Sequence, residues 1–337
     1  ATLPLRSRSA ARRDISRIMT LYLASRGSQL ALWQAEYVSA RIRAARPDIR
    51  VEIRIVRTTG DRITDVPLSQ VGDRALFTKE VDQVVLDGQA HAAVHSLKDL
   101  PTQTPDGLAL GAITVREDPR DAYVPAPGRP ARLARLPKGA RVGTSSLRRR
   151  ALLLHARPDL AVDDLRGNLD TRLARLEAGD YDAVILAAAG IRRLGREEVV
   201  GQWLEPPQWL PAAGQGALAI AIRADDEVTR QIVAALDHSD TRAATTAERA
   251  FLAELQGGCQ VPIGTLATVE GESLRVSGVV ADLEGHTVVR GETQGDLRDA
   301  AALGQRLADE LLRRGAREIL DAIRRTDMST RPPAETP

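Results

Sequence analysis

The sequence predicts an α/β fold followed by a smaller C-terminal α+β domain. Short apolar strands alternate with helical segments in two successive stretches of the chain. Such alternation is typical of sheets with parallel strands and right-handed crossovers. From about Asp237 the pattern changes to one helix, three strands and a long final helix. The chain has 337 residues, 43% of them hydrophobic, which is enough for two or three domains.

The first stretch begins with an apolar strand from Leu21. The apolar residues that follow recur at the spacing of a helix: Leu30, Trp33, Tyr37, Val38 and Ile42. Strand alternation returns over 51–55. Residues 58–77 are polar and have no period, which predicts a mobile functional loop. A helix over 78–87 and a strand over 90–95 follow.

The second stretch begins after a proline-rich segment. Five prolines lie between Glu117 and Gly139, and they predict a crossover between domains. Strands are expected over 141–144, 160–165 and 183–187, each followed by a helix. One more buried strand is expected over 215–222, where the chain returns to the first sheet. The predicted domains are therefore 21–117 with 216–236, then 118–215, then 237–327.

The third domain is expected to contain a helix before Cys259 and strands near 266–269, 274–280 and 287–290. Residues 328–337 are a predicted tail. Residues 1–20 carry five arginines and one acid, without the apolar core of a secretory signal, and are expected to be a disordered basic extension. They are either an organellar transit segment, which implies a stroma or matrix location, or an extension upstream of a start at Met19.

Composition excludes several classes of protein. The formal net charge is +2 and only 3% of residues are aromatic, which disfavours a nucleic-acid binder despite the many arginines. The sequence has no apolar run of about 20 residues, so no membrane partner is expected. The single cysteine excludes an internal disulfide and indicates a reducing compartment such as the cytoplasm.

Polar residues gather at the predicted carboxyl ends of strands, where open α/β sheets bind ligands. They are Arg26, Ser28, Lys98, Asp99, Ser145 to Arg150, Arg166 and Arg193. Several of them begin helices, whose free N–H groups add affinity for anions. We expect a ligand with several carboxylates or phosphates. In the alternative interpretation, Ser28 and Ser145 are ordinary N-caps and the arginines form a solvated surface.

Two side chains are candidates for chemistry. Asp99 follows Lys98 after an apolar strand, so its carboxylate could stabilise a cation or move a proton, unless it only caps a helix before Pro101. Cys259 lies in a glycine-flanked loop, where a thiol is accessible for covalent chemistry, unless it is a small buried hydrophobe. Lys98 is expected to bind an anion rather than form a Schiff base.

His91 and His95 lie at alternate positions of one strand and have no cysteine or acidic partner at ligand spacing. We expect them to be core residues, and we expect no metal site.

Seven segments resemble those of the porphobilinogen deaminase family, also called hydroxymethylbilane synthase. In chain order they are 25–34 (SRGSQLALWQ), 93–101 (AVHSLKDLP), 117–121 (EDPRD), 143–149 (GTSSLRR), 165–172 (LRGNLDTR), 211–217 (PAAGQGA) and 257–264 (GGCQVPIG). The resemblance extends from about Leu21 to about Ile323. It implies two domains like those of periplasmic binding proteins, which flank a cleft, and a third domain that presents a cofactor loop.

The resemblance also implies a reaction. Family enzymes are transferases of tetrapyrrole (heme and chlorophyll) biosynthesis that condense four porphobilinogen molecules head-to-tail, release ammonia and hydrolyse off the linear hydroxymethylbilane. They carry a covalently attached dipyrromethane cofactor, which would be bound through a thioether at Cys259. A cytoplasmic monomer is expected.

The family's functional residues map onto this sequence. The catalytic aspartate is Asp99, which would stabilise a cationic azafulvene by preorganised electrostatics. The implied cofactor-binding residues are Cys259, Lys98, Asp99, Ser146, Arg148 and Arg149. The implied substrate-binding residues are Arg26, Ser28, Gln34, Arg166, Arg172 and Arg193.

The predicted mobile loop departs from the family pattern. Lysines are common in the family at the positions of Gln70 and Arg74, and glycine is common where Ala75 stands. The resemblance therefore implies a lid role for the loop, but no contacts of individual residues.

A rival from another class is a solute-binding protein of the same architecture that binds an anion without turnover. Such a protein would have no use for Cys259 or Asp99.

Overall fold

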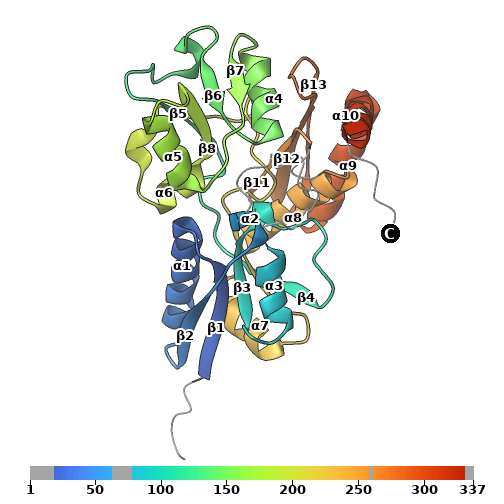
Figure 1. Ribbon diagram of the computed structural model, residues 1–337. Helices are drawn as coiled ribbons and strands as arrows, with labels where there is room; N and C mark the ends of the chain where they lie inside the picture. The colour runs from blue at the N-terminus through green and yellow to red at the C-terminus, as the bar shows by residue number, and fades with distance from the viewer. Residues whose placement is uncertain (1–18, 63–77, 258–260, 331–337) are drawn as a thin grey trace, which may run out of the picture.

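The computed structural model describes residues 19–62, 78–257 and 261–330. These residues form two five-stranded sheets and one three-stranded sheet, each with its own helices (Figure 1). In Figure 1 the first domain lies at the bottom, the second at the top, and the third, in orange and red, at the right. The predicted class, two α/β domains with a smaller C-terminal α+β domain, is confirmed. The boundaries between the domains stay predictions.

The first domain has a mixed sheet with strand order β2-β1-β3-β10-β4. Its strands are β1 (Met19–Arg26), β2 (Ile49–Val56), β3 (Ala92–Ser96), β4 (Leu108–Ile113) and β10 (Leu218–Arg223). Its helices are α1 (Gln29–Ala45), α2 (Thr59–Arg62), α3 (Lys79–Leu86), the 3-10 turn η1 (Leu97–Asp99) and α7 (Glu227–Val233). The chain returns to this sheet through β10, as predicted, but β10 is antiparallel to β3 and β4. The expectation of a purely parallel sheet is therefore wrong.

The second domain has strand order β7-β6-β8-β5-β9. Its strands are β5 (Asp121–Pro125), β6 (Arg141–Gly143), β7 (Ala161–Asp163), β8 (Ala183–Ala187) and β9 (Gln202–Leu204). Its helices are α4 (Leu147–Ala156), α5 (Leu169–Glu177) and α6 (Ala188–Arg193). Strand β5 lies inside the segment that we expected to be only a crossover, and it is antiparallel to β8. Proline is tolerated there because β9 pairs with residues 121–123 of β5, so Pro125 is at an edge on that side.

The third domain is an antiparallel sheet of order β11-β12-β13. Its elements are α8 (Ser239–Glu254), β11 (Ile263–Glu270), β12 (Ser273–Ala281), β13 (Val288–Asp296), α9 (Ala300–Leu311) and α10 (Arg317–Thr330). Phe251 of α8 and Leu307 of α9 are fully buried in the core beside the sheet. The expected single C-terminal helix is two helices, because Gly315 between them has φ 108°, a conformation that favours glycine.

Two chain ends differ from the sequence prediction. Strand β1 begins at Met19, so residues 19–20 of the expected disordered extension belong to the first sheet. Helix α10 extends to Thr330, past the expected end of the third domain at 327. Residues 1–18 and the predicted lid over 63–77 lie outside the described residues, as do Gln70, Arg74 and Ala75.

Two crossovers, residues 114–120 and 205–217, connect the first two domains. Glu248 of α8 is completely buried and ties the third domain to both crossovers. Its carboxylate accepts hydrogen bonds from Arg116 at 2.6 and 3.0 Å and from the backbone N–H of Gly214 at 2.7 Å. It also accepts one from the N–H of Ala267 in β11 at 2.8 Å. The three domains therefore meet at one fully bonded carboxylate.

Among the described helices, none combines the length and the apolar character that crossing a membrane requires.

Candidate functional site

Asp121, the first residue of β5, is the centre of a buried polar network. Its Oδ2 accepts hydrogen bonds from Arg148 Nη1 and from Trp209 Nε1, both at 2.7 Å. Its Oδ1 accepts from Arg149 Nη2 at 2.8 Å and Nε at 3.1 Å, and from Gln215 Nε2 at 2.9 Å. Burial alone would raise the pKa of Asp121, but the two guanidinium charges hold it well below its ordinary value. The carboxylate is thus ionised and compensates one of the two arginines.

The two arginines lie in the first turn of α4, directly after β6. Ser146 is the N-cap of this helix, since its Oγ accepts a hydrogen bond from the N–H of Arg149. Each of the two residues is 5% exposed, so the solvated-surface interpretation is wrong for this pair. The N-cap interpretation is wrong for Ser145, whose Oγ donates to Leu165 O at 2.8 Å. It holds for Ser28, whose Oγ accepts from the first turn of α1.

Gln215 connects this network to the first domain. It is 1% exposed and lies in the second crossover. Its Nε2 also donates to Pro119 O at 2.7 Å and to Arg120 O at 3.1 Å in the first crossover. Its Oε1 accepts from Lys98 Nζ at 3.3 Å and from Arg149 Nη2 at 3.5 Å. One amide therefore joins both crossovers to a lysine of the first domain and an arginine of the second.

Lys98 lies in the 3-10 turn that follows β3. Burial lowers the pKa of its ammonium to about 8, although the neighbouring Asp99 raises it, and the charges of Arg149 and Arg148 lower it further. These mutual effects mean that the end of β3 lies within electrostatic reach of α4 in the second domain.

Asp99 is the last residue of the same turn and its side chain is exposed. No hydrogen bond to its carboxylate is found among the described residues, so the helix-cap interpretation has no support. Its charge acts on the second domain: burial and Arg149 lower the pKa of Arg172 to about 10, and Asp99 opposes that shift. We call Lys98, Asp99, Asp121, Arg148, Arg149, Arg166 and Arg172 the interdomain charge cluster.

Three arginines among the predicted site residues of the second domain, Arg166, Arg172 and Arg193, have no carboxylate partner within the described ranges. Arg172 Nε donates to Gly167 O at 2.9 Å, and Arg193 Nη2 donates to Gly216 O at 2.7 Å. Burial lowers the pKa of Arg193 to about 10. Arg166 Nη1 is buried without a hydrogen-bond partner in the described part of the chain. Because a buried, uncompensated cation is costly, an anionic ligand is the partner that this arrangement fits.

The remaining predicted residues lie on the first domain. Arg26 ends β1 and is half-buried. Gln34 of α1 is buried, and its Nε2 donates to Ser96 Oγ at 3.0 Å, which ties α1 to the end of β3. The Arg193 guanidinium lies 5.8 Å from the ring centre of Trp33, so α1 also meets the second domain.

The two histidines are structural. His95 is buried, with Nε2 2.9 Å from Asp82 Oδ1, an acidic partner that the sequence interpretation missed. His91 Nδ1 accepts from the N–H of Tyr22 at 2.9 Å. Within the described ranges no group of three or more His, Cys, Asp or Glu side chains could hold a metal ion.

Cys259 lies outside the described residues, between α8 and β11. Its covalent role stays a prediction. Sequence reasoning missed Asp121, Gln215 and Glu248, although the first two lie in the segments EDPRD and PAAGQGA that carried the resemblance. A carboxylate at the start of a buried apolar segment was the available signal for Asp121.

Comparison with known proteins identifies two matching family models. The first, "Porphobilinogen deaminase, dipyromethane cofactor binding domain", matches residues 21–231, and the second, "Porphobilinogen deaminase, C-terminal domain", matches residues 243–313. The porphobilinogen deaminase of Pelobacter propionicus is 49% identical over 303 residues, which cover 90% of this chain and 97% of that protein.

Two solved structures show weaker likeness. A periplasmic binding protein of Salmonella typhimurium with high arginine specificity is 13% identical and has a TM-score of 0.35, covering 65% of this chain and 91% of its own. A TRAP periplasmic solute binding protein of Desulfovibrio salexigens is 10% identical, with a TM-score of 0.38, and the match covers 93% of this chain and 87% of that one.

The Asp121 network leads to a stability prediction. Asp121→Asn leaves two buried guanidinium groups without their counter-charge, so it should lower the free energy of unfolding by about 3–5 kcal/mol. Asp163→Asn is the matched control in the same domain, because it removes only the partly exposed ion pair with Arg141 and should cost less than about 1 kcal/mol. Urea unfolding of both variants measures the difference, and equal losses would contradict the central role of Asp121.

Proposed function

Because the chain belongs to the porphobilinogen deaminase family, we propose that the interdomain charge cluster is the active site of its hydroxymethylbilane synthase activity. The protein is a transferase that condenses four porphobilinogen molecules head-to-tail with release of ammonia and hydrolyses off the linear tetrapyrrole. Its cofactor is dipyrromethane. We propose the following roles for the residues of the site.

The residues present fit a dipyrromethane whose pyrroles carry acetate and propionate groups. The observation that carries the proposal is the surplus of positive charge. Within the described residues, Arg166 has a buried nitrogen without a hydrogen-bond partner, and the hydrogen bonds of Arg172 and Arg193 go to backbone carbonyls. When bound, the cofactor supplies the pyrrole carbon to which the first substrate unit is joined. We assign its covalent attachment to Cys259, and its carboxylates to Lys98, Ser146, Arg148 and Arg149.

Substrate carboxylates are assigned to the cations and polar groups around this set: Arg26, Ser28, Gln34, Arg166, Arg172 and Arg193. Ser28 and Ser146 use Oγ as an acceptor for their helices, which leaves each hydroxyl proton to be donated to a carboxylate. Bidentate binding by arginine suits a product that gains two carboxylates with every added pyrrole.

Asp99 is assigned the catalytic role. Its carboxylate is exposed, and its hydrogen-bonding capacity is unused by the described residues. It can accept hydrogen bonds from pyrrole N–H groups and stabilise the positive charge that develops as ammonia leaves the substrate. The negative charge of Asp99 opposes the binding of anions to the surrounding cations. Stabilisation of a positively charged intermediate would explain the presence of a carboxylate at this position.

We further propose that the protein acts as a monomer without a nucleic-acid or membrane partner. The formal net charge of +2 and the aromatic content of 3% support the absence of a nucleic-acid partner. The single cysteine supports a reducing compartment, and we propose the cytoplasm.

The attachment to Cys259 is tested by intact mass. Cys259→Ser should give a folded protein without the added mass of two pyrrole units and without activity, because a hydroxyl cannot replace the thiolate nucleophile under these conditions. Retention of both the added mass and the activity would exclude Cys259 as the attachment residue.

Asp99→Asn tests the catalytic role. The amide keeps the size of the side chain but removes its charge, so kcat should fall by about 10²-fold or more while the melting temperature stays near that of the parent protein. Steady-state kinetics on the cofactor-loaded variant are the measurement. A change confined to KM would mean that Asp99 contributes only to uniform binding.

The lowered pKa of Lys98 gives a pH prediction. Its ammonium binds a carboxylate below pH 8, and that charge is lost as pH rises through about 8. Assembly of the cofactor on cofactor-free protein from porphobilinogen, which loses ammonia as each bond forms, is followed by intact mass. Above pH 8 it should slow in the parent protein relative to Lys98→Arg, in which the guanidinium stays protonated. Ionisation of the Cys259 thiol affects both proteins alike, so a ratio of the two rates that does not change with pH would rule out this role of Lys98.

A further inference from the structure

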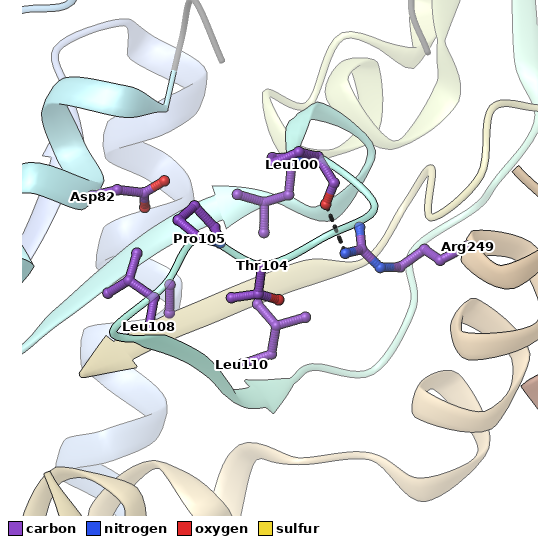
Figure 2. Close-up of a pocket in the computed structure, with 9 residues that line it drawn as sticks. Asp82, Leu100, Thr104, Pro105, Leu108, Leu110 and Arg249 are labelled. Carbon is purple, nitrogen blue, oxygen red and sulfur yellow. Dashed lines mark hydrogen bonds between the residues drawn. The ribbon is translucent and has the colours of Figure 1, made fainter. Parts of the chain in front are cut away.

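Arg249, the residue after the buried Glu248 on α8, extends from the third domain to the loop that follows Asp99 (Figure 2). Its Nη2 donates to Pro101 O at 2.7 Å and to Thr102 O at 3.0 Å. The accepting carbonyls lie two and three residues after Asp99. Arg249 thus binds the backbone of the loop that directly follows the turn containing Asp99.

Charge pairing does not account for this arginine. No carboxylate of the described residues forms an ion pair with it, and burial lowers the pKa of its guanidinium. Arg242 on the same helix shows the ordinary arrangement, a bidentate ion pair with Asp237. A half-buried guanidinium that bonds to carbonyls loses part of its hydration, and no ion pair offsets that cost. We therefore expect Arg249 to serve in positioning the backbone that it binds rather than in stabilising the fold.

The loop that it binds is held at its two ends by other contacts, since Leu100 packs against the core beside Leu97 and Gly107 O accepts a hydrogen bond from the N–H of Ala224. Between these ends, over 101–106, the hydrogen bonds from other described elements come from Arg249. Residues 100–107 contain no helix or strand, and a small pocket lies between this loop and the sheet. Leu100, Thr104 and Pro105 line the pocket on the loop side, and Asp82 and Leu110 line it on the side of the domain (Figure 2). The two hydrogen bonds from Arg249 therefore contribute to where the residues after Leu100 lie.

The donor is fixed. Glu248 joins α8 to Arg116 and to Gly214 of the two crossovers, so the start of Arg249 is anchored to the centre of the molecule. The same helix leads in sequence toward Cys259. We infer that Arg249 is a positioning residue for the reaction: by holding the carbonyls of Pro101 and Thr102 it sets the place of the Asp99 carboxylate relative to the third domain. This inference rests on the catalytic role proposed for Asp99.

The test compares Arg249→Met with Arg242→Met in cofactor-loaded protein. Arg249→Met should load the cofactor, as judged by intact mass, and should lower kcat at least about tenfold with little change in KM, since small displacements of a reacting group are costly. Hydrogen exchange over 100–108 should become faster in this variant. Arg242→Met should leave kcat and exchange unchanged. Equal kcat in the two variants would overturn the inference.

A double-mutant cycle separates positioning from general stability. If Arg249 acts through Asp99, then Arg249→Met should reduce the residual kcat of Asp99→Asn by less than about twofold. The same tenfold loss in both backgrounds would overturn the inference. Arg249→Lys retains a hydrogen-bond donor, so its kcat should lie above that of Arg249→Met. If Arg249→Met does not fold, Arg249→Lys replaces it in the double-mutant cycle with Asp99→Asn. Normal kcat in Asp99→Asn alone would instead overturn the role of Asp99 itself.

Discussion

One buried carboxylate, Asp121, determines how the charged groups of this protein can be arranged. An isolated ion in the interior costs several kcal/mol, and it is tolerated only when its hydrogen bonds are complete. Asp121 receives two guanidinium groups, an indole N–H and an amide N–H. The amide of Gln215 also holds the first crossover and Lys98. The position of α4, the course of both crossovers and the end of β3 therefore depend on the same network.

The network holds the arginines and Lys98 in place but does not neutralise all of their positive charge. Asp121 compensates one of two arginines, and Arg166, Arg172 and Arg193 have no carboxylate partner among the described residues. Burial lowers the pKa of Lys98, Arg172 and Arg193, which shows that these groups are held in surroundings that disfavour their charge. A near-neutral protein, with a formal net charge of +2, thus concentrates positive charge where its first two domains meet. Such a site is preorganised for a ligand that brings several carboxylates.

The sequence predicted the elements better than their partners. The spacing of apolar residues was sufficient to predict the alternation of strands and helices and the return of β10 to the first sheet. The polar residues at the ends of predicted strands were sufficient to predict that Asp99 follows a strand of the first sheet. Strand β5 was missed in its proline-rich segment, and the expected parallel direction was wrong for β10, because direction depends on pairing between distant segments. The partners of Asp121 could not be predicted for the same reason, since they lie 27 to 94 residues away in the chain. The roles of Cys259 and of the predicted lid remain predictions from the resemblance.

We propose that the carboxylates of bound dipyrromethane compensate the charge surplus between the first two domains. The melting temperatures of cofactor-loaded and cofactor-free protein, each measured with and without sodium sulfate, test this proposal. The loaded protein should melt at a higher temperature, and sulfate should stabilise the cofactor-free protein more, because its anions occupy cations that are otherwise uncompensated. Equal melting temperatures, with an equal response to sulfate, would contradict the account.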